Sequence, residues 1–599
     1  MIVDKYIRPG LELADWISQI HASALHTSGW MYLSTIMIAS GVPGKGESIM
    51  YIVHDAHHIF STPTRDSINT RRSANLLIQG CALLSPEQPG KLLRNQDILI
   101  RGQHIIAIGP SGTLPHNPLR IDRVLHGEGR IAMPGLVNAH THSLENVLKA
   151  SSPSLPLELW LVSLFANAME WSPRLVYLST LLGAVEMLKT GTTAVLDHLW
   201  TGAGVDAHYL DATMNAYRDA GIRASVAPSI EDQDLVLDAA ASRGLALPSH
   251  PFIDRFSLWA PIAEQVAVLE QFISTWHNTE NGRLRCLVGP SGIHWCSQKL
   301  LEDCRDMADR YQTGMHLHAV ETELQARIIN ERLGQSGIRY LDQLGILRPG
   351  TSLAHTIWLE DGDLPILART GTTVVHNPIS NLRLGSGRFP LRAALKQGVA
   401  VALGSDGSAS NDNQNMFGVL KLTGLMHNLP DIDYKKWPQA AEILAMGTTG
   451  GSTALGLTSG RHDLKAQARE APLASEYLPL SENAFMDAPG EIAPEQLADL
   501  VLIDLDSDAF LPLRDPYLHL VYCEHGVSVD TVIVNGEVVV ERGKVTNVDE
   551  RALRREIREY YRATQSALPA HLEYASATSD VLASLDTLRR LVLPKHDDE

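Results

Sequence analysis

Short apolar runs alternate with segments of helical period through the middle of the chain. Eight runs rich in Val, Ile, Leu and Thr are typical of buried strands. They span residues 131–139, 192–198, 222–229, 284–290, 314–319, 352–356, 372–377 and 399–405. The clearest helix between them is predicted to begin at Ser172-Pro173, an N-cap followed by a proline in the first turn, and to stop at Gly191.

Eight strands alternating with helices over this length predict an α/β fold, a (β/α)8 barrel of the TIM type, which takes about 250 residues. An open, doubly wound sheet is the alternative. That fold predicts a glycine-rich phosphate-binding loop after the first strand, and the sequence has none there. The barrel is therefore the better interpretation.

Further strand-like runs lie on both sides of this section, and one of them carries Asn535-Gly536 as a hairpin turn. Two such blocks predict one small β-sandwich formed by N- and C-terminal segments. We divide the chain into an N-terminal appendage of unknown role (1–72), the first part of the sandwich (73–133), the barrel (134–457), an inserted loop (458–490), the second part of the sandwich (491–548) and a helical tail (549–599).

Composition limits the kinds of binding partner and the cellular compartment that we expect for this protein. The 599 residues include 50 basic and 68 acidic side chains, and the net charge of −18 argues against nucleic acid or an anionic membrane as the main partner. The five cysteines form no C-x-x-C pair, which excludes a thiolate zinc cluster and fits a reducing cytoplasm. The longest early apolar stretch, residues 29–41, is shorter than the ~20 residues that span a bilayer. We expect a cytoplasmic protein without a membrane segment or signal peptide.

Polar side chains gather where the predicted strands end, which is where barrel enzymes place their chemistry. The first strand ends in His140-Thr141-His142, whose imidazoles point to the same face. The later strand ends carry His316, His318, Glu321, His355, His376 and Asp406. Any one of them could be a buried structural residue, but their coincidence at five strand ends predicts a metal site. The cluster at His54, His57 and His58 has no matching ligands at a recognisable spacing, and we interpret it as structural or surface.

Five motifs resemble the amidohydrolase superfamily. They are PGLVNAHTH (134–142), HLHAVET (316–322), LAHTIWL (353–359), VVHNPISNLRLGSG (374–387) and LGSDGSASNDN (403–413). The resemblance is to the cytosine-deaminase-like branch, which includes adenosylhomocysteine and methylthioadenosine deaminases, 8-oxoguanine deaminase and triazine hydrolases. It covers residues 73 to 550 without the 458–490 insertion, and it implies a homo-oligomer.

The resemblance makes His140, His142, His318 and Asp406 the ligands of a divalent ion. Three neutral imidazoles and a carboxylate suit Zn²⁺, which we prefer, or Fe²⁺, and they leave a position for a water whose pKa falls towards ~7. A two-metal site would need a carboxylated Lys or a Glu at the end of the fourth strand, and residues 284–294 have neither. One ion per subunit is therefore predicted.

The resemblance also assigns catalytic roles. Glu321 would move protons between the water, the ring nitrogen and the leaving amine, although a Glu at this position could instead stabilise a helix start. His355 would polarise the substrate or hold the hydroxide, and Asp406 would also accept a proton. His316 lies deeper on the strand that carries His318, and we assign it to packing.

Candidates for substrate contact are Trp160, His198, His294, Trp295 and Asn377. Trp160 could equally be core, and Asn377, like Asn381, could stabilise its own loop. Ser291 stands where adenosylhomocysteine deaminases carry a His, and Leu148-Lys149 stands near the usual place of an Arg. These departures count against simple nucleoside deamination.

The leading hypothesis is a metal-dependent hydrolase that attacks a small-molecule aminated N-heterocycle or cyclic amidine and releases ammonia. An alternative keeps the site but expels an alkylamine or chloride, or opens or closes an amide ring of a urea- or pyrimidine-like natural product. A catalytically inactive barrel is disfavoured, because the sequence retains the four ligands and Glu321.

Overall fold

The computed structural model describes residues 75–84, 91–114, 121–166, 171–201, 204–428, 433–457, 490–565 and 575–594. All of these residues belong to the unit Arg72–Glu599. The predicted appendage, with its histidines at positions 54, 57 and 58, lies outside the described residues. Residues 458–489 of the predicted insertion also lie outside them.

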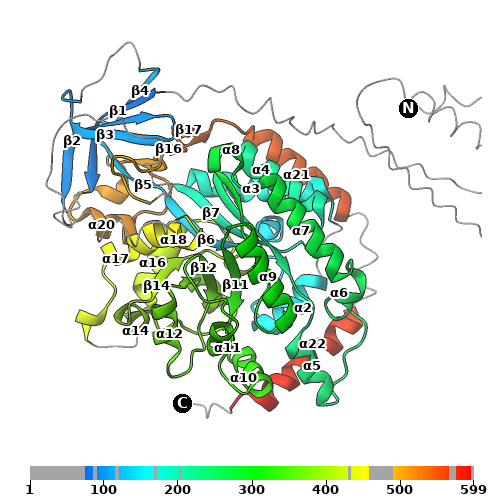
Figure 1. Ribbon diagram of the computed structural model, residues 1–599. Coiled ribbons are helices and arrows are strands. Elements are labelled where there is room, and N and C mark those ends of the chain that lie inside the picture. The colour runs from blue at the N-terminus through cyan, green and yellow to red at the C-terminus, as the bar shows by residue number, and fades with distance from the viewer. Residues whose placement is uncertain are drawn as a thin grey trace, which may run out of the picture. The chain divides into compact units, whose positions relative to one another are not determined.

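Parallel strands form the centre of this unit (Figure 1). One sheet contains β6 (Leu136–Thr141), β7 (Thr192–Leu199), β8 (Arg223–Ile230), β9 (Leu284–Cys286) and β10 (Gly289–Pro290). The other contains β11 (Met315–Ala319), β12 (Thr351–His355), β13 (Thr373–His376) and β14 (Ala400–Leu403). Parallel bridges join Val288 to Met315 and Gly292 to His318 between the sheets. All eight predicted strands are confirmed, although the first and the fourth each divide in two.

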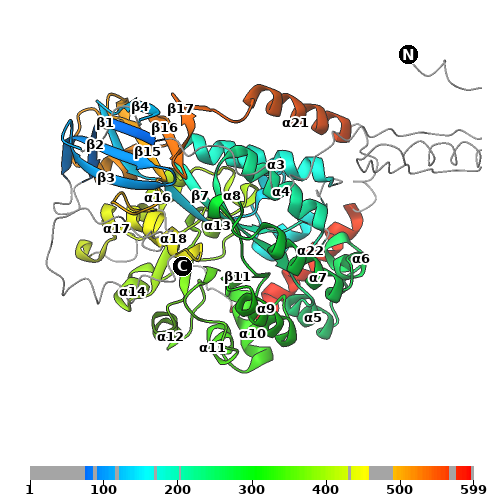
Figure 2. The same cartoon turned by 45° about the horizontal axis from the view of Figure 1, so that its top comes forward.

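Helices alternate with these strands and cover them on the outside (Figures 1 and 2). The helix predicted from Ser172-Pro173 is α3 (Pro173–Lys189), and the Ser172 hydroxyl accepts a hydrogen bond from the Leu175 N–H, as an N-cap should. The others include α2 (Leu157–Ala166), α4 (Ala207–Ala220), α5 (Leu235–Ser242), α6 (Pro251–Leu258), α7 (Ile262–Trp276), α9 (Gln298–Arg310), α10 (Glu323–Leu333), α11 (Gly337–Gln343), α12 (Asp363–Thr370), α13 (Pro378–Arg383), α14 (Leu391–Lys396), α16 (Met416–Met426) and α17 (Ala440–Ala445).

Strands from both ends of the chain share one nine-stranded sheet. In order along the chain they are β1 (Asn75–Leu84), β2 (Leu92–Arg101), β3 (His104–Pro110), β4 (Arg123–His126), β5 (Arg130–Pro134), β15 (Leu500–Asp504), β16 (Val529–Val534), β17 (Glu537–Glu541) and β18 (Lys544–Val545). β5 pairs with β15 and so joins the early to the late strands. The predicted turn between β16 and β17 is confirmed, because Asn535 and Gly536 both have positive φ, at 55° and 77°.

The chain passes from this sheet to the parallel strands at Gly135. A side chain at this position would collide with the side chain of Thr193, so the close approach requires glycine. A buried ion pair bridges the same junction. Arg223 at the start of β8 donates through Nε to Asp499 Oδ2 (2.6 Å) and through Nη2 to Asp499 Oδ1 (3.1 Å), just before β15. The Asn535 N–H also donates to Asp499 Oδ1 (2.7 Å).

The predicted helical tail contains α21 (Glu550–Gln565) and α22 (Ala575–Val592). Leu585 and Leu588 of α22 are buried in a cluster with residues of α2, α5 and α10. Arg589 donates to Glu158 Oε2 of α2 (2.8 Å), and Glu158 Oε1 accepts from the Thr322 hydroxyl at the start of α10 (2.5 Å). The last helix is therefore tied to two helices beside the ends of the parallel strands.

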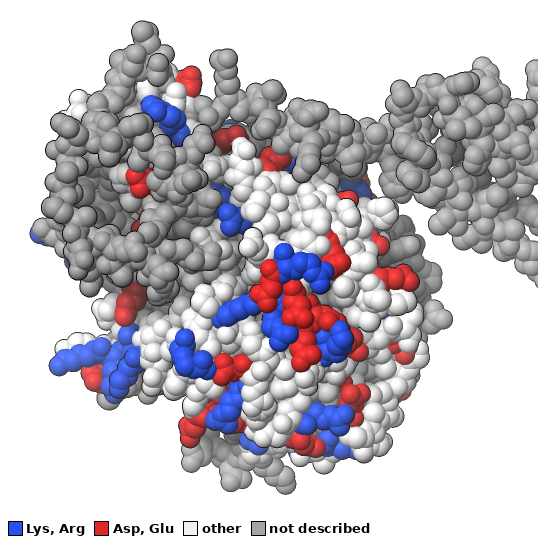
Figure 3. Space-filling model, in the orientation of Figure 1, with Lys and Arg blue, Asp and Glu red and all other residues white. Residues whose placement is uncertain are grey.

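Acidic and basic side chains are intermixed on the face of the molecule shown in Figure 3. Among the described residues, no helix combines the length and the apolar content needed to cross a bilayer.

Candidate active site

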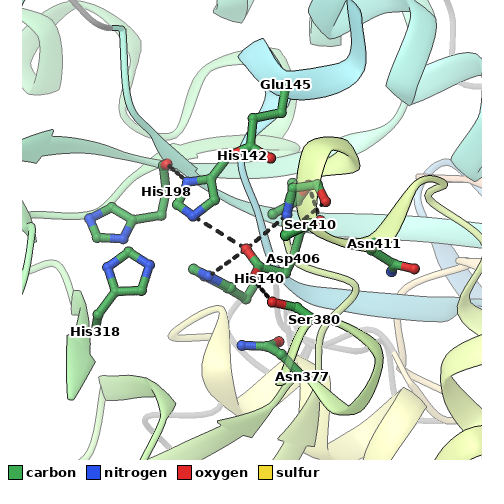
Figure 4. Close-up of polar contacts among 12 residues, drawn as sticks. His140, His142, Glu145, His198, His318, Asn377, Ser380, Asp406, Ser410 and Asn411 are labelled. Atoms are coloured by element: carbon green, nitrogen blue, oxygen red, sulfur yellow. Dashed lines mark hydrogen bonds and ion pairs between the residues drawn. The ribbon is translucent and has the colours of Figure 1, made fainter. Parts of the chain in front are cut away.

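The predicted metal ligands come together at the carboxyl ends of the parallel strands (Figure 4). One ring nitrogen from each of His140, His142 and His318 lies within 4.8 Å of the others. Asp406, just beyond β14, places Oδ1 3.4 Å from Nε2 of both His140 and His142. The His140 Nε2 atom is buried without a hydrogen-bond partner. A buried, unsatisfied nitrogen in such a donor set fits a divalent cation.

Each of these imidazoles is held through its other nitrogen. The His142 Nδ1–H donates to the His198 carbonyl oxygen (2.6 Å), and the His318 Nδ1–H donates to the Ser291 carbonyl oxygen (2.7 Å). Both bonds place the proton on Nδ1 and leave the Nε2 lone pair free. Burial lowers the pKa of His140 to about 4 and holds that of His318 well below its usual value. Neutral imidazoles are the form that a metal requires.

His316 does more than the packing predicted for it. Its Nε2 is hydrogen-bonded to His140 Nδ1 (2.8 Å), and its Nδ1 to the Ser352 hydroxyl (2.7 Å). It therefore orients His140 from the side that faces away from the carboxyl ends of the strands. Two other groups around His140 are also compact enough to hold an ion, one with His198 and His316 and one with His355 and Asp406.

Glu321 lies between β11 and α10, beside the four candidate ligands. The Ser386 hydroxyl donates to its Oε1 (3.0 Å), and its Oε2 lies 3.6 Å from His355 Nε2. Burial raises the pKa of Glu321 to about 7. A carboxyl group with such a pKa can both give and take a proton near neutral pH.

His355 is fixed by a hydrogen bond between its Nδ1 and Asn381 Oδ1 (2.8 Å). Its Nε2 therefore faces Glu321 and, at 4.0 Å, Asp406 Oδ2. The backbone here is strained, because His355 and Asp406 adopt positive φ values of 67° and 66°. Non-glycine residues held in this conformation concentrate at functional sites.

Glu145 is a further residue of the site that was not predicted from the sequence. This residue lies in the 3-10 helix Ser143–Val147, is buried, and accepts a hydrogen bond from the Ala409 N–H at Oε2 (3.0 Å). Burial raises its pKa to about 7. A signal was present in the spacing, because Glu145 follows His142 by three residues, as Glu321 follows His318.

A cavity opens above these groups. Its described lining includes Glu145, Glu321, His355 and Asp406. Of the residues predicted to contact substrate, Trp160 and Trp295 belong to this lining.

The other three predicted contacts lie behind the lining. The His198 ring stacks on His318 with centroids 4.8 Å apart, and the His294 ring packs against Trp295 at 4.0 Å. Asn377 places Nδ2 3.4 Å from His355 Nδ1. A direct contact of these three with substrate stays a prediction.

Asp197, at the end of β7, holds the loop that follows His142. Its Oδ1 accepts the Ser143 N–H (3.0 Å), and its Oδ2 accepts the Tyr217 hydroxyl (2.9 Å). Both Asp197 and Tyr217 are fully buried. The hydroxyl therefore satisfies a carboxylate that water cannot reach.

We expect Tyr217→Phe to lower the free energy of unfolding by about 1–3 kcal/mol, because it leaves a buried acceptor unpaired. Urea denaturation measures the change. Tyr177→Phe is the matched control, since the Tyr177 hydroxyl donates to Asp219 (2.9 Å) at a half-buried position. An equal decrease in the free energy of unfolding in the two variants would contradict a special contribution of the buried hydrogen bond to Asp197.

Comparisons with known proteins agree with this geometry. Residues 131–473 match the model of the amidohydrolase family. The chain is 31% identical over 481 residues to the 5-methylthioadenosine/S-adenosylhomocysteine deaminase of Pelotomaculum thermopropionicum, covering 80% of this chain and 96% of the relative. It is 29% identical over 488 residues to the 5'-deoxyadenosine deaminase of Methanosarcina acetivorans, covering 81% and 97%.

The structure is similar to that of atrazine chlorohydrolase TrzN from Arthrobacter aurescens complexed with zinc. The TM-score is 0.68 at 27% identity, covering 81% of this chain and 99% of that one. Together with the family match, this similarity confirms the predicted TIM-type fold with parallel strands.

Proposed function

Because the chain belongs to the amidohydrolase family, we propose that it is a metal-dependent hydrolase that releases ammonia from an aminated N-heterocycle or cyclic amidine. One observation carries this proposal: three imidazoles and a carboxylate meet beside a buried Glu, at one end of a cavity. The deaminases of adenosine derivatives among the relatives support the choice of leaving group.

His140, His142, His318 and Asp406 would hold one divalent ion, with Zn²⁺ preferred to Fe²⁺ because the similar chlorohydrolase contains zinc. When bound, such an ion polarises the substrate and lowers the pKa of water. Glu321 takes a proton from water at its carboxylate and gives it to the ring nitrogen beside the carbon under attack, which makes that carbon more electrophilic. It then passes a second proton from the added water to the amine, and the bond between the carbon and the amine breaks to release ammonia. His355, fixed by Asn381, presents Nε2 to the same space and orients the reacting groups.

A second candidate keeps the site and changes the leaving group to chloride or an alkylamine, or opens or closes an amide ring. Two observations favour it. The structure resembles a chlorohydrolase, and the cavity is lined by Ser291, where the sequence departs from the motif of the adenosylhomocysteine deaminases that it resembles. The Ser291 hydroxyl is hydrogen-bonded to Ser229 (2.6 Å).

The proposal is tested by measuring the metal content of the protein and by identifying the group that it releases from the substrate, which is ammonia, chloride or an alkylamine. We expect chelation to abolish ammonia release and added Zn²⁺ to restore it. His142→Asn should lower metal affinity by about 10–100-fold or more, since even the partners of ligands have effects of this size. His208→Asn, an exposed histidine of α4, is the control and should bind metal normally.

Unchanged metal content in His142→Asn would contradict the ligand assignment. Release of chloride or an alkylamine in place of ammonia, across a panel of substituted heterocycles, would favour the second candidate.

We also propose that the parallel strands close into the predicted (β/α)8 barrel over residues 134–457. The Asp406 N–H donates to the His140 carbonyl oxygen (2.9 Å), which supports contact between the first and last strands. We propose that residues 73–133 and 491–548 form a sandwich, and a shared cluster including Ile78, Ile98 and Leu502 supports it. A cytoplasmic homo-oligomer completes the proposal, and the five unpaired cysteines support the reducing compartment.

A further inference from the structure

We propose that the cavity selects a neutral heterocycle that carries an apolar alkyl or aryl substituent, and that it discriminates against the same ring with a charged tail. This inference rests on the proposed function, because it takes the reacting ring to lie at Glu321 and Asp406. It concerns the outer part of the cavity, which the reaction itself does not use.

One face of α2 forms an apolar wall of the cavity. The lining residues of this helix follow the helical period, and they are Leu157, Trp160, Leu161, Leu164 and Phe165. Four of these five side chains are buried, as the apolar face of a helix usually is, and the same face also borders the cavity. Leu384 adds a further apolar side chain to the same lining.

An aromatic corner extends this wall. The ring of Phe165 packs edge-to-face on Trp200 at 4.9 Å and on Phe252 of α6 at 5.3 Å. All three rings line the cavity. Such rings present apolar surface and little hydrogen-bonding capacity, so they stabilise an alkyl or aryl group that leaves water.

The described lining contains a single Arg or Lys side chain, Arg255, and its charge is already matched within the protein. Its Nε donates to Glu231 Oε1 (2.9 Å), and its Nη2 donates to Asp234 Oδ2 (2.7 Å). Its Nη1 donates to the Phe252 carbonyl oxygen (2.7 Å). The guanidinium also lies over the rings of Phe252 and Phe256, at 4.6 and 4.4 Å.

The guanidinium of Arg255 is therefore hydrogen-bonded through all three nitrogens and packed against two aromatic rings, and 1% of the residue is exposed. An anionic tail would have to displace a carboxylate from it.

A cationic tail fares no better. Glu231 and Asp234 already share one guanidinium, and Asp234 Oδ2 also accepts the Trp295 Nε1–H (3.2 Å). An ammonium group would lose its water and would have to compete with Arg255 for either carboxylate. The lining thus favours an uncharged substituent over either charge.

Calorimetric titration of the metal-loaded Glu321→Gln protein tests this preference without turnover. The probes are 6-aminopurine, cytosine and 2-amino-1,3,5-triazine rings, each carrying a butyl, a 3-carboxypropyl or a 3-aminopropyl chain. For at least one ring we expect the butyl form to bind at least about tenfold more tightly than both charged forms. Equal or tighter binding of a charged form, or binding of no probe, overturns the inference.

A charge placed on the wall gives a second test. Leu161 is half-buried on the cavity face, so Leu161→Lys should weaken the butyl probe and strengthen the carboxypropyl probe about tenfold. Leu258→Lys adds the same charge at a residue of α6 that is 71% exposed and outside the lining, and it should change neither. Identical effects of the two variants would show that the wall does not contact the tail.

The two proposals fail separately. A preference for butyl probes without ammonia release from any ring would leave the apolar tail site standing and overturn the deaminase assignment. Ammonia release by the wild-type protein without a preference for butyl over carboxypropyl substrates would do the reverse.

Discussion

Glu321→Gln is expected to lower kcat for ammonia release by about 10²–10⁴-fold. Gln matches Glu in shape and can still accept the hydrogen bond from Ser386, but its amide cannot carry a proton between water and the ring nitrogen. Because Glu321 is not among the residues proposed to hold the ion, metal content should stay at the wild-type level. Steady-state kinetics with the best substrate of the panel, together with metal analysis, measures both quantities.

Two controls separate proton transfer from packing. Glu323→Gln makes the same chemical change two residues later, where the carboxylate pairs with Arg327 at the surface, and it should leave kcat unchanged. Ser386→Ala removes the hydroxyl that donates to Glu321 and should have an intermediate effect. Near wild-type kcat in Glu321→Gln with normal metal content would remove the proton-transfer role.

Arg223→Ala is expected to lower the free energy of unfolding by about 3–5 kcal/mol. The substitution leaves Asp499 buried and charged, with no cation beside it. Arg223 and Asp499 are 2% and 1% exposed, so water cannot replace the lost partner. The pair joins β8 to the segment before β15. We therefore expect the substitution to destabilise the junction between the parallel strands and the nine-stranded sheet. Urea denaturation followed by circular dichroism gives the value.

Arg243→Ala is the matched control, because Arg243 pairs with Glu331 at the surface and such pairs contribute about 0–1 kcal/mol. A double variant, Arg223→Ala with Asp499→Ala, should be less destabilised than the sum of its parts, since it leaves no unpaired charge. Additive losses would show that the two side chains do not stabilise each other.

The strand pattern could be predicted because parallel strands are buried on both faces and so appear as continuous apolar runs. The break at Gly135 could not, because the residues on its two sides read as one strand, and only the pairing of β5 with the distant β15 separates them. Local periodicity carries no information about a partner more than 360 residues away in the chain.

The candidate metal residues could be predicted because they follow strand ends directly. The role of His316 could not, because its contact with His140 joins β11 to β6 across the centre of the fold. The face of α2 that lines the cavity could not be predicted from the sequence either. Nearly every residue of LELWLVSLFA is apolar, so the side facing the cavity looks the same as the side facing the core. Charge matching at Arg255 depends on Glu231 and Asp234, which belong to a different segment.

The link from Arg589 through Glu158 to Thr322 has a consequence for synthesis of the protein. A ribosome makes Glu321 and Asp406 long before it makes Arg589, and domains fold from the N-terminus as they emerge. A nascent or prematurely terminated polypeptide can thus contain every candidate catalytic side chain while α2 still lacks the hydrogen bond from Arg589 to Glu158. We therefore expect the apolar face of α2 to reach its final position only after α22 has been synthesised.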